Sequence, residues 1–284
     1  RNMENMAENK KKPVSRVAVI HDLCSVGKAA LTNILPVLSV MGIEACPLPT
    51  MILSTHTGGF GKPVMRALPA FPSQCGGHLK ENHIEFDHIF IGYLGNPELI
   101  RNVEEFLRLY PDAKVLLDPI MADHGSFYSH FDVSYGKQMQ GLLKYSSILT
   151  PNYTESCFLA EEVYEPHCSE EKLSRICERI AALGAEKVVV TSVPIIEAEM
   201  SIAVYEQGNL RILKRKQAGR SYPGTGDLFA AVLEGCTMKG MPLMESARKA
   251  HDFVSRCIAM SDACGYPVRE GVMLEPNLHH LFVP

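Results

Sequence analysis

Short runs of β-branched and apolar residues alternate with longer amphipathic segments along most of this chain. Runs of four to eight such residues are typical of buried strands, whereas three- and four-residue spacing of apolar positions is typical of helices. Alternating strands and helices form βα units and a mainly parallel sheet. The strand candidates are Val17–Ile20, Glu44–Leu48, His88–Ile91, Lys114–Leu117, Ser147–Leu149 and Lys187–Thr191.

Amphipathic segments between these strands predict helices over about Lys28–Met41, Pro97–Leu109, Glu155–Val163 and Glu170–Leu183. Further along, Ile202–Tyr205 and Leu210–Leu213 flank Gln207-Gly208-Asn209, which is a hairpin signal. The last two predicted helices are Thr225–Lys239 and Leu243–Ser261. No repeat or Pro/Ser-rich linker follows the polar start of the sequence. We therefore predict a disordered leader over residues 1–15 and one doubly wound α/β domain over residues 16–284.

Net charge limits the kinds of partner that we expect, and cysteine usage limits the expected cellular compartment. The 284 residues carry a formal net charge of -4, and the basic runs are only three residues long. Neither nucleic acid nor an anionic membrane is therefore an expected partner. Nine cysteines are scattered without a C-x-x-C pair, which favours a reducing compartment over a disulfide scaffold. With no apolar signal region or membrane-length stretch, we expect a cytoplasmic protein.

Ligands of open α/β sheets bind outside the carboxyl ends of the strands, so the residues after each strand are candidates for a site. His21-Asp22 follows the first predicted strand, and Gly27-Lys28 comes shortly after it. A Walker A loop is excluded, because Asp22 and Ala29 stand where that motif needs glycine and Ser or Thr. The second and third strands are followed by Ser54–Gly59 and by Gly92-Tyr93.

Two carboxylates, Asp118 and Asp123, follow the fourth predicted strand. Hard oxygen ligands at the mouth of a sheet suit magnesium held together with phosphates. Asp before Pro is also common in turns, and spacing alone does not decide between these readings. Residues 150–155 follow the fifth strand and fit a helix start, with Pro151 in the first turn. After the sixth strand, Thr191 and Ser192 could face a phosphate or simply close the strand.

The segment Gly224-Thr225-Gly226-Asp227 opens a predicted helix. The first N–H groups of a helix have no intrahelical partner, and the positive end of the helix dipole favours an anion there. Asp227 lies in the first turn, where it could merely complement that dipole. The carboxylates and hydroxyls that follow other strands favour a role for Asp227 beyond stabilising the helix. Phosphoryl transfer needs N–H donors, a metal that neutralises polyphosphate charge and a nearby proton acceptor.

Five ordered motifs carry a resemblance to a known family: Ser54–Gly58, Gly92-Tyr93, Asp118–Asp123, Leu149–Asn152 and Gly224–Ala231. Gly224-Thr225-Gly226-Asp227, with Asn152-x-x-Glu155 upstream, resembles the ribokinase superfamily of small-molecule kinases. The five motifs together resemble its pyridoxal kinase branch, from about Val17 to the last helix. The resemblance implies a ribokinase-like fold, ATP and magnesium as cofactors, a vitamin B6 substrate and a homodimer.

The resemblance also implies roles for individual residues. Asp227 would take the proton of the substrate's 5′-hydroxymethyl group, and the N–H groups of Gly224, Thr225 and Gly226 would hold the transferred phosphoryl group. Asp118 and Glu155 would organise magnesium, largely through waters. The ATP side would be formed by Asp123, Thr150, Asn152, Thr191 and Ser192, and Thr150 and Thr191 would border a monovalent cation, for which potassium is a candidate. The vitamin side would be formed by Asp22, His56, Thr57 and Tyr93.

One departure concerns Asp22, because typical pyridoxal kinases have serine there in a Gln-Ser-His context. An acid at this position resembles the Asp-containing turn of hydroxymethylpyrimidine kinases. We hypothesise that it favours pyridoxamine or pyridoxine over pyridoxal as the substrate. The sequence thus predicts an ATP-dependent vitamin B6 kinase. Two alternatives stay open: a hydroxymethylpyrimidine kinase of thiamine metabolism, and a non-catalytic vitamin- or nucleotide-binding protein on the same scaffold. Residues 214–219, just before the helix start, fit a mobile flap.

Overall fold

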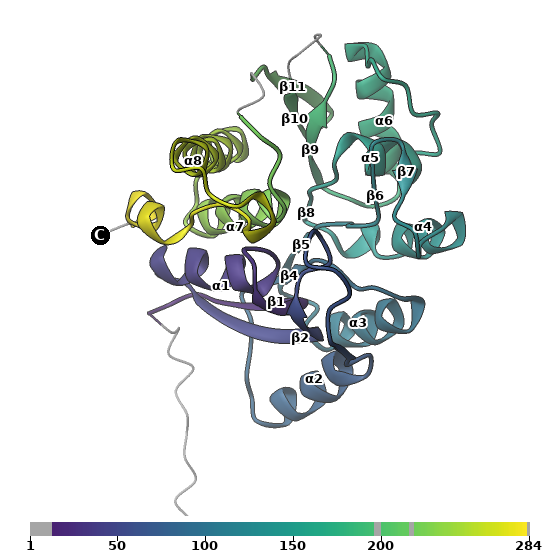
Figure 1. Cartoon of the computed structure of the whole chain (residues 1–284). Helices are drawn as coiled ribbons and strands as arrows, with labels where there is room; N and C mark the ends of the chain where they lie inside the picture. Colours follow the sequence, from purple (N-terminus) through teal and green to yellow (C-terminus); the bar gives the residue numbers. More distant parts are fainter. Residues whose placement is uncertain (1–12, 196–199, 216–218, 283–284) are drawn as a thin grey trace, which may run out of the picture.

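The computed structural model describes residues 13–195, 200–215 and 219–282, and within these residues nine strands form one mixed sheet. The central strands are β1 (Arg16–Val26), β2 (Glu44–Thr55), β4 (His88–Ile91), β5 (Lys114–Leu117), β8 (Ile148–Leu149) and β9 (Lys187–Val193). The outer strands are β3 (Met65–Ala67), β10 (Ser201–Glu206) and β11 (Asn209–Leu213). The strand order is β11-β10-β9-β8-β5-β4-β1-β2-β3, in which β3, β10 and β11 are antiparallel to their neighbours (Figure 1).

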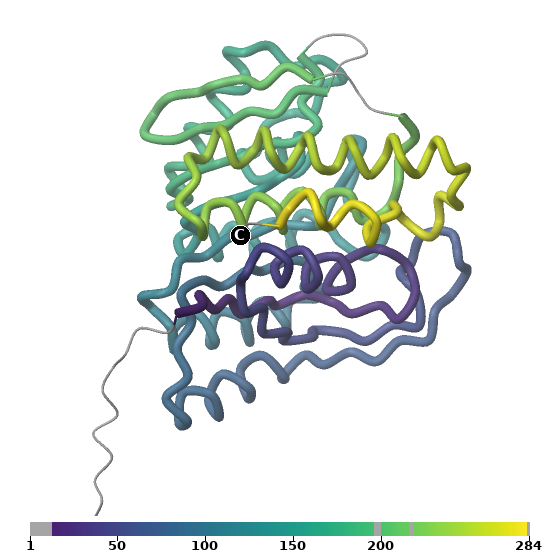
Figure 2. The backbone as a smooth tube through the Cα atoms, turned by 90° about the vertical axis from the view of Figure 1, so that its left-hand side faces the viewer, coloured from purple at the N-terminus to yellow at the C-terminus, as the bar shows by residue number. Residues whose placement is uncertain are grey.

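Helices cover both faces of the sheet (Figure 1). One layer contains α1 (Leu31–Val40), α7 (Thr225–Met238), α8 (Leu243–Ala263) and the 3₁₀ helix η3 (Glu275–Leu281), and Figure 2 looks onto α1, α7 and α8 running side by side. The other layer contains α2 (Phe71–Glu81), α3 (Pro97–Leu109), α4 (Val133–Gln140), α5 (Tyr153–Leu159) and α6 (Glu170–Ala182).

Side chains of the central strands alternate between the two layers, as the two-residue period of a strand requires. Val17 and Val19 of β1 pack against the layer of α1 and α7, whereas Ala18 and Ile20 pack against the opposite layer. Because both faces are buried, these strands consist of nearly continuous apolar residues. The predicted doubly wound α/β architecture is therefore confirmed.

The topology places a crevice at the carboxyl end of β1. This strand pairs in parallel with β2 on one side and with β4 on the other, so the chain order reverses at β1. Ligands of doubly wound sheets bind at such a switch point. In the part of the chain that the structure describes, no helix is both long and apolar enough to cross a membrane.

Several predicted boundaries were wrong. The first strand does not end at Ile20, because β1 continues its pairing with β2 as far as Val26 and Thr55, with an irregularity between His21 and Leu23. His21 and Asp22 therefore lie within a strand. Thr191 and Ser192 likewise lie inside β9, which pairs with β10 up to Val193.

Helix boundaries differ for local reasons. The first helix begins at Leu31 and not at Lys28, because Ala30 has a φ of 54° and the N–H of Lys28 donates to the carbonyl of Glu270 (2.9 Å). The helix predicted over 155–163 begins at residue 153, because Asn152 caps it, and it ends at residue 159. Helices α2 and α4 were not predicted. Gly76 and Gly77 weaken the helical pattern of α2, and α4 is only eight residues long.

Candidate active site

The start of α7 is built around a glycine that no other residue could replace without strain. Gly224 has a φ of 80°, and a Cβ atom added to it would lie 1.9 Å from the carbonyl oxygen of Lys28. Asn33 ties the two segments together, since its Nδ2 donates to the carbonyls of Lys28 (2.7 Å) and Gly224 (3.0 Å). The close approach presents the first turn of α7 to the crevice at the end of β1. The first N–H groups of this turn have no intrahelical acceptor.

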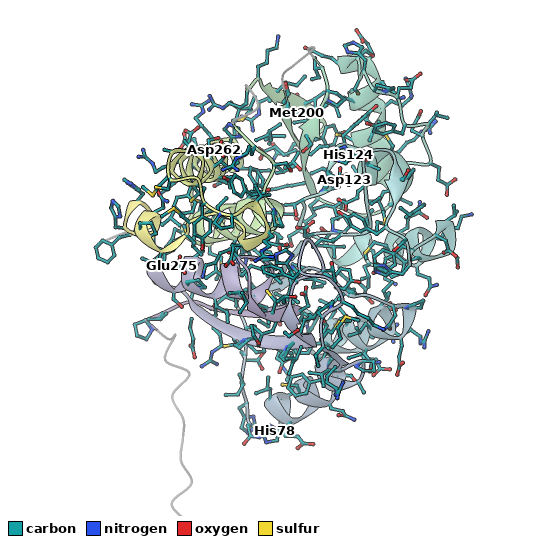
Figure 3. All side chains as sticks on the ribbon, in the orientation of Figure 1. His78, Asp123, His124, Met200, Asp262 and Glu275 are labelled. Atoms are coloured by element: carbon teal, nitrogen blue, oxygen red, sulfur yellow. The ribbon has the colours of Figure 1, made fainter. Side chains whose placement is uncertain are left out.

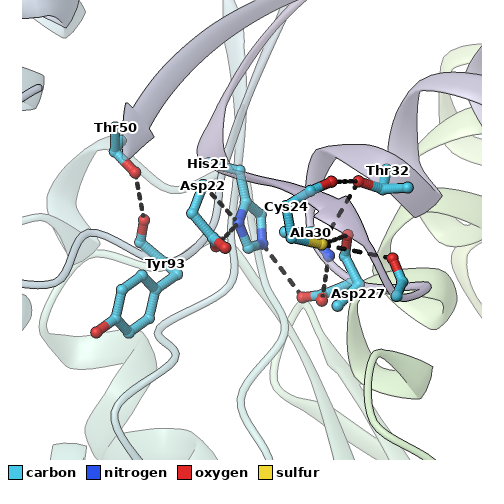
Figure 4. Close-up of polar contacts among 10 residues, drawn as sticks. His21, Asp22, Cys24, Ala30, Thr32, Thr50, Tyr93 and Asp227 are labelled. Carbon is cyan, nitrogen blue, oxygen red and sulfur yellow. Dashed lines mark hydrogen bonds and ion pairs between the residues drawn. The ribbon is translucent and has the colours of Figure 1, made fainter. Parts of the chain in front are cut away.

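Asp227 lies in this first turn, and both of its carboxylate oxygens have a partner. Oδ2 accepts a hydrogen bond from the N–H of Ala30 (2.7 Å), and Oδ1 lies 3.2 Å from Nε2 of His21 (Figure 4). The side chain keeps 13% of its surface exposed. The Asp227 carboxylate is therefore held in one orientation at the edge of the crevice and still has lone pairs for a ligand.

His21 is buried between two carboxylates. Its Nδ1 lies 2.8 Å from Oδ1 of Asp22, opposite the contact of Nε2 with Asp227 (Figure 4). Burial alone would lower the pKa of this imidazole, but Asp227 and Asp22 raise the pKa of His21 to about 10. In turn, burial works to raise the pKa of Asp227, but the His21 ring and the Ala30 N–H outweigh it and lower that pKa. Asp227 is therefore ionised at neutral pH.

Asp118 and Glu155 form the acidic part of the site. Both are buried, with 7% and 3% of their surfaces exposed. Burial, followed by the charges of Glu155 and Asp227, raises the pKa of Asp118 well above its usual range. Burial likewise raises the pKa of Glu155 to about 8, although the N–H groups of Asn152 and Met121 counteract it. A cation at this position would relieve the repulsion between these carboxylates.

The two carboxylates differ in how they could serve a metal. Oε1 of Glu155 accepts from the N–H of Met121 (3.0 Å), and Oε2 accepts from the N–H of Asn152 (2.9 Å) in a capping box. Among the described residues, none of the hydrogen bonds reaches the carboxylate oxygens of Asp118, whose N–H donates to Ile91 (2.8 Å). Asp118 thus fits a magnesium ion, and Glu155 fits contact through water, since its oxygens already hold backbone donors.

The predicted nucleotide-side residues come together at the ends of β8 and β9. Asn152 and Thr191 form a bridge, in which the N–H of Thr191 donates to the carbonyl of Pro151 (3.0 Å). Thr150 is buried and follows β8 directly. Ser192 has a φ of 56°, which is uncommon for a residue with a side chain and marks a local strain.

Asp123 lies apart from Asp118, on a two-stranded hairpin of β6 (Ala122–Asp123) and β7 (Ser126–Phe127). Asp123 and its neighbour His124 are labelled in Figure 3. The Asp123 side chain is 47% exposed, and its Oδ1 accepts from the N–H of His124 (2.8 Å). Its charge acts on Glu155, so Asp123 belongs to the acidic side of the site at longer range.

The residues that the sequence predicted for the vitamin side differ in how their side chains are engaged. Nδ1 of His56 accepts from the N–H of Gly58 (3.0 Å), and its Nε2 lies 2.5 Å from the carbonyl of Arg269. Both ring nitrogens are therefore used within the protein. Thr57 is exposed. The hydroxyl of Tyr93 lies 2.6 Å from Nε2 of His130, and burial, followed by the charge of Asp22, raises the pKa of Tyr93 to about 12.

Sequence reasoning missed several residues of the site. It gave no role to His21, Tyr128 or His130, and Ala30 contributes only a backbone N–H. Tyr128 is 39% exposed, and burial, followed by the charges of Glu155, Asp123, Asp118 and Asp227, raises the pKa of its phenol. His21 could have been found from the sequence, because it is an ionisable residue that directly follows a buried apolar run and stands beside Asp22. Tyr128 and His130 lie in a loop with no motif.

Two further residues near the site have structural partners. Cys24 is buried, and its Sγ lies near the carbonyls of Gly27 (3.4 Å) and Ala29 (3.6 Å). Burial raises the pKa of this thiol, which opposes a nucleophilic role. Lys28 forms an ion pair with Glu275 of η3, labelled in Figure 3, and so is not simply a solvated residue. Of the predicted flap 214–219, residues 216–218 lie outside the described residues.

Comparison with known proteins identifies the family. A family model described as phosphomethylpyrimidine kinase matches residues 39–271. The chain belongs to the phosphomethylpyrimidine kinase family. A Bacteroides thetaiotaomicron protein assigned to phosphomethylpyrimidine kinase, crystallised with pyridoxal, is 34% identical with a TM-score of 0.90, covering 95% of this chain and 96% of that one.

Two named vitamin B6 kinases are similar to this member of the phosphomethylpyrimidine kinase family. The pyridoxal kinase of Lactobacillus plantarum is 29% identical with a TM-score of 0.87, covering 94% of this chain and 96% of that one. The pyridoxine/pyridoxal/pyridoxamine kinase of Bordetella bronchiseptica is 25% identical, covering 79% of this chain and 81% of that protein. The predicted ribokinase-like fold and the resemblance to pyridoxal kinases are therefore confirmed.

Proposed function

We propose that this chain is an ATP-dependent vitamin B6 kinase that phosphorylates the 5′-hydroxymethyl group of pyridoxal, pyridoxamine or pyridoxine. The observation that carries this proposal is the ionised Asp227 carboxylate, held in the first turn of α7 beside N–H groups without intrahelical acceptors. The similarity to kinases that act on B6 vitamers supports the choice of substrate.

The chemistry follows from this arrangement. A substrate hydroxyl within hydrogen-bonding reach of Asp227 gives its proton to that carboxylate as the oxygen attacks the γ-phosphorus of ATP. The bond from phosphorus to the bridging oxygen of ADP breaks, and ADP leaves. The N–H groups of Gly224, Thr225 and Gly226 hold the moving phosphoryl group. Because the transition state is loose, positioning and charge stabilisation contribute more to the rate than the base does.

Both sides of the crevice supply binding groups in this proposal. Asp22, His56, Thr57 and Tyr93 form the vitamin side, where His56 acts by shaping the pocket since its ring nitrogens are engaged. The ATP side is formed by Asp123, Thr150, Asn152, Thr191 and Ser192.

Asp118 and Glu155 would hold Mg²⁺, Asp118 directly or through water and Glu155 through water. Bound magnesium supplies positive charge that neutralises the ATP phosphates. Thr150 and Thr191 would border a monovalent cation, with potassium as the candidate. A homodimer in the cytoplasm completes the proposal and follows the pattern expected of the pyridoxal kinase branch.

Hydroxymethylpyrimidine kinase activity is the second candidate, favoured by the family model that matches the chain and by the acid at Asp22. The two substrate classes share a hydroxymethyl group on a nitrogen heterocycle, so the Asp227 chemistry would serve either. Only recognition of the ring differs.

A coupled ADP-release assay on the purified protein separates these functions. Pyridoxal, pyridoxamine, pyridoxine and hydroxymethylpyrimidine are each supplied with Mg–ATP, and the phosphorylated product is identified by mass spectrometry. We expect the highest kcat/KM with a B6 vitamer. Preference for hydroxymethylpyrimidine would support the second candidate, and ligand binding without any ADP formation would contradict both.

A further inference from the structure

The side chain of His21 is confined to one position in the site. Only 1% of its surface is exposed, and its ring packs on Gly92, where an added Cβ atom would lie 2.0 Å from Cδ2 of the imidazole. A side chain at position 92 would therefore displace the ring. This contact gives the glycine of the Gly92-Tyr93 motif a physical reason, because the residue that follows β4 must leave room for an imidazole beside Asp227.

The two carboxylates around the ring define its protonation. Nδ1 lies 2.8 Å from Asp22 and Nε2 lies 3.2 Å from Asp227. A neutral imidazole has one N–H, so one carboxylate would face a lone pair. The N–H of Asp22 also lies 3.0 Å from Nδ1, a contact that suits an unprotonated Nδ1. The charged carboxylate lies closer and interacts more strongly than the amide, so we assign a proton to both nitrogens.

A doubly protonated ring cannot accept a proton from Asp227, which excludes a relay in which His21 is the final base. The ring can orient the Asp227 carboxylate and hold it in its ionised form, together with the N–H of Ala30 at 2.7 Å. We propose that His21 is a positioning residue of this kinase, an imidazolium that fixes the Asp227 base between β1 and α7 through its ion pairs with Asp227 and Asp22. This inference rests on the proposed function of Asp227.

The other titratable groups around this pair do not replace His21 as the cation. Both ring nitrogens of His56 are engaged by backbone groups, Nδ1 by the N–H of Gly58 (3.0 Å) and Nε2 by the carbonyl of Arg269 (2.5 Å), so His56 forms no ion pair with Asp227. The remaining described groups that interact with His21, Asp22 or Asp227 are Cys24 of β1, Tyr93 after β4, Asp118 after β5 and Tyr128 after β7. None of these four can carry a positive charge.

The His21→Gln variant tests the proposal, since glutamine retains a donor for Asp227 and removes the charge. An opposite charge at this distance lowers the pKa of a carboxyl by about 1 to 3 units. We therefore expect the acidic limb of the kcat/KM profile to move up by about 1 to 3 pH units, and kcat at neutral pH to fall about 10- to 100-fold. Ionisations of the vitamer are common to both enzymes and cancel in the comparison.

His88→Gln is the matched control. His88 begins the central strand β4, at the end of the strand opposite to the site, and its Nδ1 lies 2.8 Å from the fully buried carboxylate of Glu234. We expect this variant to keep the wild-type pH profile. An acidic limb that does not move in folded His21→Gln, or one that moves equally in His88→Gln, would overturn the proposal.

Histidine-selective ¹⁵N NMR of the wild-type protein gives a result that does not depend on the folding of a variant. One imidazole must keep both protons at about pH 8.5, well above the ordinary histidine range. If every histidine ring has lost a proton there, the proposal fails. This readout is independent of the substrate, so its failure is distinguishable from failure of the proposed function.

Discussion

Replacement of Gly224 by alanine should damage both the fold and the site. The residue has a φ of 80°, and the new Cβ atom would meet the Lys28 carbonyl oxygen at 1.9 Å and the Ala29 Cα at 2.9 Å. The left-handed backbone costs a residue with a side chain roughly 1–2 kcal/mol. Overpacking against backbone adds about 1–3 kcal/mol, because the carbonyl cannot rotate away as a flexible side chain can.

We therefore expect Gly224→Ala to lower the free energy of unfolding by about 2–5 kcal/mol. At roughly 2–4 °C per kcal/mol for a chain of this size, the melting temperature should fall by about 4–20 °C. The start of α7 must move by about 1 Å to relieve the contact, and such a displacement of a catalytic group lowers kcat by about 100-fold. Thermal unfolding and steady-state ADP release measure the two effects separately.

Two other glycines provide the comparison. No heavy atom lies within 4 Å of a Cβ added at Gly226 or at Gly77. Gly226→Ala should keep the melting temperature within a few degrees and still lower kcat, because the methyl group enters the space that we assign to the phosphoryl group. Gly77→Ala in α2 should change neither activity nor fold appreciably. Gly224→Ala with a wild-type melting temperature would refute the steric reasoning, and normal kcat in that variant would refute the assignment of the α7 start to the site.

Three other substitutions test separate parts of the account. Because burial and Glu155 raise the pKa of Asp118 above 3.8, the metal-free folded protein binds a proton that the unfolded chain has lost, so its free energy of unfolding falls as pH rises above that value. Asp118→Asn should reduce this pH dependence in chelator, leaving the part due to the raised pKa of Glu155, and should lower kcat with Mg–ATP; an unchanged slope in thermal unfolding would contradict the assignment. Cys24→Ser should keep kcat within about two-fold, since the buried thiol contacts backbone carbonyls, and a loss above about 100-fold would indicate a chemical role. Asp22→Ser should lower kcat/KM for pyridoxamine and pyridoxine relative to pyridoxal, and unchanged ratios among the three vitamers would exclude Asp22 as a selector.

The sequence predicted the core of the sheet well, because strands buried on both faces are short apolar runs. The run His88–Ile91 and the run Lys114–Leu117 became β4 and β5 with the predicted bounds. The extension of β1 to Val26 was not predictable in the same way, since polar residues such as His21 and Asp22 continue a strand only because β2 lies alongside. That pairing is a tertiary contact and has no local signal.

The sequence named candidate residues for the site, but it gave no indication of the contacts among them. Asp227 and Gly224 carry a local motif, so the sequence indicated them directly. The pair of His21 and Asp227 joins residues 206 positions apart, and the hydrogen bond from Ala30 to Asp227 spans 197 positions. Contacts over such separations depend on how α7 packs against the start of α1. For His56 the family resemblance implied a place on the vitamin side, whereas its ring nitrogens are used by Gly58 and Arg269.

The central claim is that Asp227 takes the proton of the hydroxyl group that is phosphorylated. Single-turnover measurement of the phosphoryl-transfer rate in Asp227→Ala, with saturating Mg–ATP and a B6 vitamer, tests it most directly. The account predicts a rate lower by roughly 10²–10⁴ in a protein that is folded and binds both substrates, which is the usual contribution of a general base. A near-normal rate in that folded variant would contradict the account.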